Sequence, residues 1–166
     1  DKHLIVQTQK GEIVEIDEKY DFSYLRNAKD FVTRKWHKFP VENESDWKDM
    51  KKRYKFDENL RIDKDIEKKA EILKDRDWVF SITIPGPFWQ MRDWCGFENL
   101  CIFMAESQDF VLDMAFFWCD FISEILSKLT EKVVLDSVII NEDMAYKEKS
   151  MISPNMIKKF LSPVWS

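Results

Sequence analysis

The chain has 166 residues, of which 45% are hydrophobic and 14% aromatic, and its formal net charge is -5. This length suits one domain, and the hydrophobic content excludes a disordered chain because it is enough to build a core. The acidic balance argues against a nucleic-acid-binding protein. The Lys and Arg residues between positions 48 and 55 are interleaved with Asp, as on a solvated helix face.

The cysteines and histidines point to no metal or disulfide scaffold. Cys95, Cys101 and Cys119 are odd in number and form no CxxC pair, so we expect free thiols and a cytoplasmic location. His3 and His37 lie far from the cysteines in sequence, so we expect no zinc site built from this chain alone. Charges interrupt the longest apolar stretch, which excludes an ordinary membrane span and a membrane partner.

Residues 1–42 are expected to form a β-hairpin followed by an extended region. His3–Gln9 and Glu12–Asp17 are β-rich, and the Lys-Gly pair between them is typical of a tight hairpin turn. Residues 20–38 are ambiguous, because their first part has helical spacing while Phe31–Phe39 alternates like a strand. We favour a strand for the second part.

Residues 43–166 are expected to form βα units within the same single domain. Asn43 or Ser45 is a candidate cap for a helix that runs through Tyr54, and Asp63 for a second helix with a narrow apolar stripe. A short helix over residues 88–94 is predicted to end at Gly96. The last predicted helix begins at Ser153-Pro154, a cap followed by proline at the first helical position.

Two apolar runs predict the central strands of an α/β fold. Trp78–Ile84 and Val133–Asn141 are separated by helical sequence that includes a long apolar helix, Asp109–Leu129. Strands joined in this way are expected to be parallel neighbours with a right-handed crossover, and the long helix is expected to pack across them. So few strands leave helix faces uncovered, so we expect Phe117, Trp118 and Phe121 not all to be buried without further chain or a second molecule.

The carboxyl ends of these strands carry the candidate site residues. Glu142 and Asp143 follow the second run directly, with Tyr146 close behind, and two adjacent carboxylates suit substrate binding or proton transfer. The alternative is an ordinary loop that caps a helix and faces water. Arg92 is expected to bind an anion there or to pair with Glu98 or Asp143.

The Pro-Gly-Pro sequence after the first run contributes two further candidates. Gly86 would let a substrate approach the backbone, and Phe88 would form an aromatic pocket wall. The alternatives are a plain strand terminator and a core aromatic. We expect Gly86, Arg92, Asp143 and Tyr146 to line one cleft at the same end of the sheet.

Short motifs follow one another through about the last three quarters of the chain: Phe39-Pro40-Val41, Asp46-Trp47, Lys52-Arg53-Tyr54, Gly86-Pro87-Phe88, Arg92, the run from Gly96 to Leu100, the run from Glu142 to Tyr146, Ile152-Ser153-Pro154 and Leu161-Ser162-Pro163. Their order and spacing resemble the uroporphyrinogen decarboxylase family in the broad sense. That family includes porphyrin decarboxylases and corrinoid-dependent methyltransferases. The segment from Phe39 to Tyr54 is more similar to the methyltransferase branch.

The resemblance implies a partial (β/α)8 TIM barrel, because such a barrel takes about 250 residues and only two core strands are recognisable here. It favours Asp143 as the catalytic residue, with Gly86, Phe88, Arg92, Glu142 and Tyr146 binding substrate. It also implies that the zinc ligands of the methyltransferases lie beyond the matched stretch, and that the Arg-rich motif of the decarboxylases precedes it. No cofactor is therefore expected within this segment, while zinc and a corrinoid protein are expected for the whole protein.

Three functions remain open on the sequence. The first is a segment of a corrinoid- and zinc-linked methyltransferase, the second a uroporphyrinogen decarboxylase, and the third a non-enzymatic binding or structural module with a βαβ core. The chain begins with Asp rather than Met, so we expect a piece of a longer protein that self-associates or joins the remainder of its barrel, and that is inactive alone.

Overall fold

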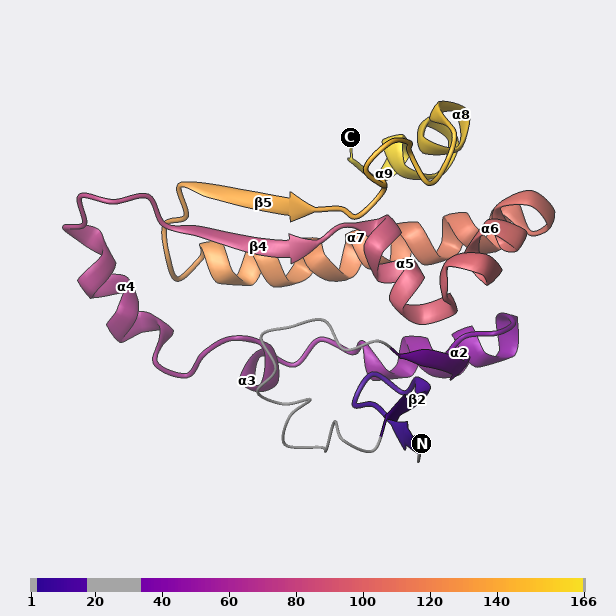
Figure 1. Cartoon of the computed structure of the whole chain (residues 1–166). Coiled ribbons are helices and arrows are strands. Elements are labelled where there is room, and N and C mark those ends of the chain that lie inside the picture. The colour runs from indigo at the N-terminus through magenta and orange to yellow at the C-terminus, as the bar shows by residue number, and fades with distance from the viewer. Residues whose placement is uncertain (1–2, 18–33, 166) are drawn as a thin grey trace.

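The computed structural model describes residues 3–17 and 34–165 (Figure 1). In chain order its elements are β1 (His3–Gln7), β2 (Ile13–Asp17), β3 (Lys35–Lys38), α2 (Glu44–Arg53), α3 (Glu58–Arg61), α4 (Ile66–Lys74), β4 (Ser81–Pro85), α5 (Pro87–Cys95), α6 (Phe97–Glu106), α7 (Gln108–Thr130), β5 (Ser137–Asn141), α8 (Pro154–Met156), a π-helical turn η1 (Ile157–Leu161) and α9 (Ser162–Trp165). The fold is mixed α/β, with two small sheets and no closed barrel in the described part of the chain.

The first sheet contains the predicted hairpin. β1 and β2 pair antiparallel, and β3 adds to the outer side of β2. The connection is longer than a two-residue turn, because β1 ends at Gln7 and the Thr8 amide donates to the Glu12 carbonyl. Gly11 has a φ of 100°, which only glycine adopts without strain. β3 confirms a strand within Phe31–Phe39, whereas residues 18–33 lie outside the described part.

The second sheet is the predicted parallel pair. β4 and β5 run side by side, in register from Ser81 opposite Ser137 to Pro85 opposite Asn141. Figure 1 shows α7 running along this pair, and the Trp118 indole donates to the Pro85 carbonyl at 3.0 Å. Both strands are shorter than predicted, because β4 begins only at Ser81 and β5 only at Ser137. Trp78 and Val79, which were predicted to belong to the first strand, are exposed.

Three helices, rather than two, connect β4 to β5, because a second helix begins directly after the predicted end of α5. Gly96 has a φ of 77° and a ψ of 157°, so it turns the chain without ending the helical region. A Cβ at this position would overlap the ring of Phe39. Gly96 therefore separates α5 from α6 and also allows the segment before α2 to pack closely.

The hydrophobic core lies among α2, α5, α6, α7 and the C-terminal helices. Trp47 and Trp94 pack with ring centroids 4.7 Å apart, and the Tyr54 ring meets Trp94, Trp118 and Phe121 edge-on. Trp118 and Phe121 are each 6% exposed, and Phe117 is half-buried. Tyr54 from the end of α2 helps to bury Trp118 and Phe121, whereas Phe117 stays half-buried although Trp47 and Tyr54 both meet its ring edge-on.

The capping predictions hold at both ends of the helical region. The Asn43 side chain accepts from the Ser45 and Asp46 amides, and Ser153 accepts from the Met156 amide. The prediction of Asp63 as the cap of α4 is wrong, because Asp65 occupies the N-cap position and forms no side-chain cap bond, while Asp63 accepts from the Asp65 amide just before the helix. The parallel sheet, by contrast, stays open: all of β5 is exposed, including Ile139 at 49% and Ile140 at 53%.

Candidate functional site

The carboxyl ends of β4 and β5 meet at one edge, where the predicted site residues gather. The Gly86 amide donates to the Asn141 carbonyl at 2.7 Å, which extends the parallel ladder by one bond. The next residue, Glu142, reaches back over α5. Its Oε1 accepts from the Phe88 amide at 3.0 Å and its Oε2 from the Trp89 amide at 2.8 Å. Glu142 therefore caps α5 from another strand.

Gly86 is required at this place by close approach rather than by backbone conformation. Its φ is -75°, which any residue can adopt. A Cβ here would overlap the carboxyl group of Glu142. The missing side chain thus lets the carboxylate reach the first amides of α5, where the helix dipole also favours negative charge.

Burial and hydrogen bonding act on Glu142 in opposite directions. Burial raises the pKa of its carboxyl group above the ordinary value, and the amides of Trp89 and Phe88 only partly offset this. The charged form of Glu142 is therefore held less firmly than its two hydrogen bonds alone would suggest.

Arg92 and Asp143 form the ion pair that was one of the two predicted alternatives. Arg92 Nη1 donates to Asp143 Oδ2 at 2.8 Å and to the Asp143 carbonyl at 2.7 Å. The guanidinium also lies near the rings of Phe88 and Phe97. It is 25% exposed and the Asp143 side chain 45%, so the pair is accessible from solvent. Within the described residues Asp143 Oδ1 has no hydrogen-bond partner, which leaves it able to accept a proton or a hydrogen bond.

The remaining predicted residues are placed less favourably for contact with a ligand. Phe88 is fully buried in the core, so its ring is closed to a ligand and contacts this edge only beneath Arg92. Tyr146 is 67% exposed, and its amide donates to the Lys149 carbonyl in a turn closed by the bridge between Ala145 and Ser150. The structure thus brings together Gly86, Arg92, Glu142 and Asp143, while the Tyr146 side chain points into solvent.

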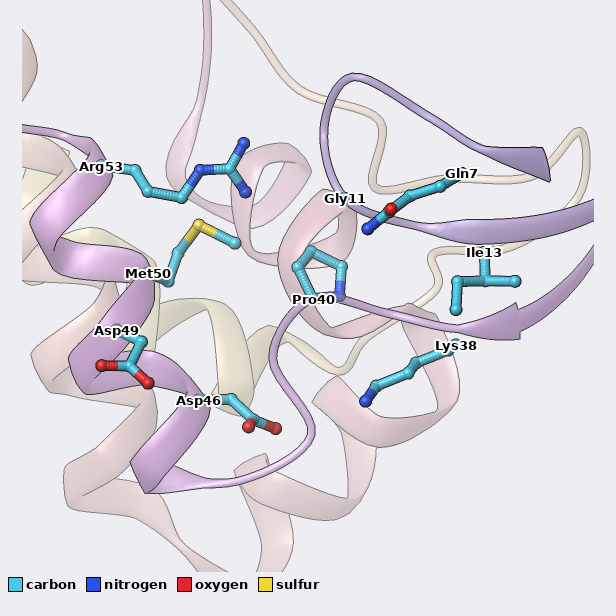
Figure 2. A pocket seen from close by; sticks show the side chains of 9 residues that line it. All are labelled: Gln7, Gly11, Ile13, Lys38, Pro40, Asp46, Asp49, Met50 and Arg53. Atoms are coloured by element: carbon cyan, nitrogen blue, oxygen red, sulfur yellow. The ribbon is translucent and has the colours of Figure 1, made fainter.

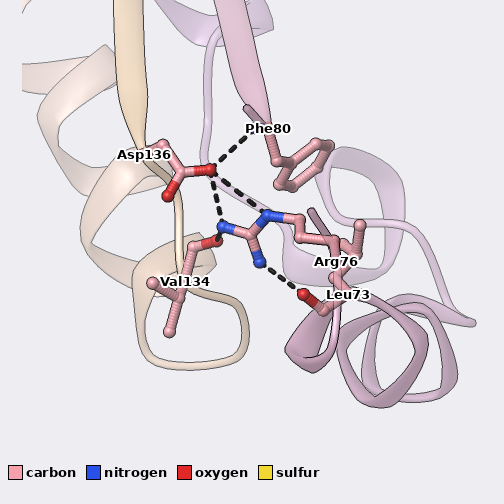
Figure 3. Close-up of polar contacts among 5 residues, drawn as sticks. All are labelled: Leu73, Arg76, Phe80, Val134 and Asp136. Atoms are coloured by element: carbon pink, nitrogen blue, oxygen red, sulfur yellow. Dashed lines mark hydrogen bonds and ion pairs between the residues drawn. The ribbon is translucent and has the colours of Figure 1, made fainter. Parts of the chain in front are cut away.

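The opposite end of the same strands holds a second Arg–Asp pair, which the sequence did not reveal (Figure 3). Arg76 donates to Asp136 Oδ2 at 2.7 and 3.2 Å, to the Leu73 carbonyl at 2.5 Å and to the Val134 carbonyl at 3.2 Å. The same Asp136 oxygen accepts from the Phe80 amide at 2.8 Å. That amide and Arg76 hold the pKa of Asp136 below its ordinary value. This pair joins α4 to the start of both strands.

Two neighbouring cavities lie around the tip of the β1–β2 hairpin. One of about 300 Å³ separates the hairpin sheet from α2 (Figure 2). Figure 2 shows Arg53 extending from α2 toward the hairpin loop at Gly11, with Met50 beside it. Arg53 also lines a second cavity, which reaches the face of α5 that carries Gln90, Asp93 and Trp94.

No cluster of three or more His, Cys, Asp or Glu residues that could hold a metal ion occurs in the described ranges 3–17 and 34–165. The same ranges contain no helix with the length and apolar character needed to cross a membrane.

No protein-family model, curated protein or solved structure shows significant similarity to this chain. The resemblance to the uroporphyrinogen decarboxylase family accordingly remains a hypothesis based on short motifs.

Proposed function

We propose that this chain is part of a (β/α)8-barrel enzyme of the uroporphyrinogen decarboxylase type, which transfers a methyl group in partnership with a corrinoid protein in the cytoplasm. The observation that carries the proposal is the edge where β4 and β5 end, since Gly86, Arg92, Glu142 and Asp143 meet there. In α/β barrels, substrates bind at the carboxyl ends of the parallel strands.

The residues at this edge have separate roles in the proposal. Asp143 contacts the substrate and moves a proton or accepts a hydrogen bond through its Oδ1, because Arg92 holds only the other oxygen. Arg92 positions Asp143. Glu142 acts mainly as a positioning residue, since both of its oxygens accept backbone N–H groups. In this proposal zinc ligands are supplied by parts of the protein other than the described ranges.

The open sheet supports the barrel part of the proposal. A two-stranded sheet is marginal alone, and parallel strands are normally covered on both faces. β5 is exposed along its whole length. Further βα units beside β4 and β5 would pair these edges and cover the strands.

A second candidate is a non-enzymatic binding or structural module. The observation that favours it is the extent to which the acidic residues are already used: Glu142 caps α5 and Asp143 pairs with Arg92. In that case the edge would hold the fold together and bind no substrate.

The test is a comparison of activities in the whole protein. Methylcobalamin with a thiol should be demethylated, as followed by the cobalamin absorbance, whereas uroporphyrinogen should release no carbon dioxide. Decarboxylation without demethylation would replace the leading function by the tetrapyrrole carboxy-lyase. Absence of both reactions in the whole protein would favour the binding module.

A further inference from the structure

The cavity beneath the hairpin tip combines cationic and aromatic side chains in a way that points to a ligand. It measures about 240 Å³ and lies between the hairpin loop, the end of α2, α3 and α5. Its lining carries three cationic side chains, Lys10, Arg53 and Arg61, and a single carboxylate, Asp93. Lys10 and Asp93 contact one another directly, so the two arginines determine the charge that a ligand would meet.

Arg53 and Arg61 form few polar contacts with the protein, and the Arg61 guanidinium also lies 5.2 Å from the centre of the Phe121 ring. Arg53 donates to the Lys10 and Gln9 carbonyls at 3.5 and 3.4 Å, and Arg61 to the Arg53 carbonyl at 3.5 Å. These contacts are long for an N–H···O bond. Neither guanidinium has a carboxylate partner within the described part of the chain. Two arginines that converge on one cavity with donors to spare suit a carboxylate, which guanidinium binds in a planar, bidentate manner.

Tyr54 supplies the aromatic part of the cavity wall, while Trp94, which is only 2% exposed, packs against it in the core. Tyr54 and Trp94 stand edge to face with ring centroids 5.4 Å apart. The Tyr54 oxygen accepts from the Trp94 indole at 2.8 Å, which leaves its own hydrogen for a further acceptor. Gln90, only 8% exposed, places its amide nitrogen 3.5 Å from the same oxygen. The accessible part of the Tyr54 ring can bind a flat apolar body by stacking or edge contacts.

The size of the cavity limits the ligand. A cavity of about 150 Å³ holds benzene, and sites for drug-sized ligands begin at roughly 300 Å³. A volume of about 240 Å³ therefore suits one aromatic ring with a small substituent. We propose that this cavity binds a small aromatic carboxylate, with its carboxyl group on Arg53 and Arg61 and its ring against Tyr54.

This site is separate from the edge where β4 and β5 end. Residues 90 and 92 lie about 200° apart around a helix. Gln90 and Trp94 consequently face the hairpin side of α5, while Arg92 faces Asp143. The inference does not depend on the proposed enzymatic function.

Isothermal titration calorimetry with benzoate tests the proposal, with benzamide as the neutral analogue of the same shape and inorganic phosphate as an anion without a ring. Benzoate should bind saturably, and benzamide and phosphate each at least tenfold more weakly. Failure of benzoate to bind, or equal binding of either comparison ligand, would overturn the proposal.

Charge-removing variants locate the binding site. Arg53→Gln and Arg61→Gln should each weaken benzoate binding at least tenfold, because each removes a charged donor. Lys55→Gln is the matched control, since Lys55 is exposed, close in sequence and outside the cavity lining, and it should bind as the unaltered protein does. Equal weakening in all three variants, or none in the arginine variants, would also overturn the proposal. Both arginines are exposed, so the variants should keep the fold, and the benzoate–benzamide comparison stands without them.

Discussion

The two ends of the β4–β5 pair contain the same pair of residue types in different surroundings. At the amino-terminal end, the Arg76 side chain is 11% exposed and donates hydrogen bonds to two backbone carbonyls and to Asp136. At the carboxyl-terminal end, Arg92 is 25% exposed and its Asp143 keeps one oxygen without a partner among the described residues. An Arg–Asp pair is therefore no indicator of function by itself. The two ends differ in how many hydrogen-bonding atoms of the Arg–Asp pair remain available for a ligand.

The largest effect should come from removing the arginine at each end in turn. Arg76→Ala removes the hydrogen-bond donor of the Leu73 and Val134 carbonyls and the charge partner of Asp136. These contacts join α4 to both strands, so Tm should fall by roughly 8 °C. Arg92→Ala removes fewer protein contacts and should lower Tm by roughly 3 °C. Thermal unfolding followed by circular dichroism measures both. Equal losses would show that the two pairs serve the same structural purpose.

Glu142→Ala should give an intermediate effect, because it removes the cap from α5. Loss of the two bonds to the Phe88 and Trp89 amides should cost about 1–2 kcal/mol in the free energy of unfolding. Urea denaturation measures this loss. The matched control is Glu148→Ala, which changes an exposed acid on the same loop and should leave stability within about 0.5 kcal/mol. If Glu142→Ala matched the control, the capping role would be wrong.

The smallest effect is a difference in pH dependence between the ends. The pKa of Asp136 is lowered, so its contribution to stability is present above its ordinary value and is lost as pH falls. The pKa of Glu142 is raised by burial, so its contribution is greatest at low pH and declines as pH rises through that raised value.

Two neutral variants test these opposite pH dependences of stability. The Tm gap between the unaltered protein and Asp136→Asn should narrow as pH falls through the acid range. The gap for Glu142→Gln should widen over the same range. Two gaps that change in the same direction would contradict the opposite environments assigned to the two carboxyl groups.

Several features of this comparison were predictable from the sequence. The two apolar runs indicated parallel strands, and the order of strand end and acidic loop placed Asp143 near Arg92. Glu142 was predicted to bind substrate, with a helix-capping loop as the alternative, but the sequence did not show which helix it caps, because Glu142 and the Phe88 amide are 54 residues apart. One signal was available: Gly86 offers α5 no side-chain cap, so an acceptor had to come from elsewhere.

Other features depend on contacts that periodicity does not reveal. Tyr54 was recognised only as a helix end, yet its ring covers Trp118 and Phe121. Arg76 and Asp136 precede their strands, at the end where no function was sought. The segment Phe97–Glu106 was missed as a helix because Gly96 was interpreted only as a terminator.

The central claim is that function lies where β4 and β5 end. The most direct test measures the rate of methylcobalamin demethylation by the whole protein that carries either Asp143→Asn or Asp136→Asn. Each change removes one negative charge from an Arg–Asp pair and leaves a side chain of nearly the same shape. We predict that Asp143→Asn lowers the rate about 100-fold while the fold persists, and that Asp136→Asn, assayed below its Tm, keeps the unaltered rate. Equal rates for the two variants would contradict the assignment of function to the end that carries Asp143.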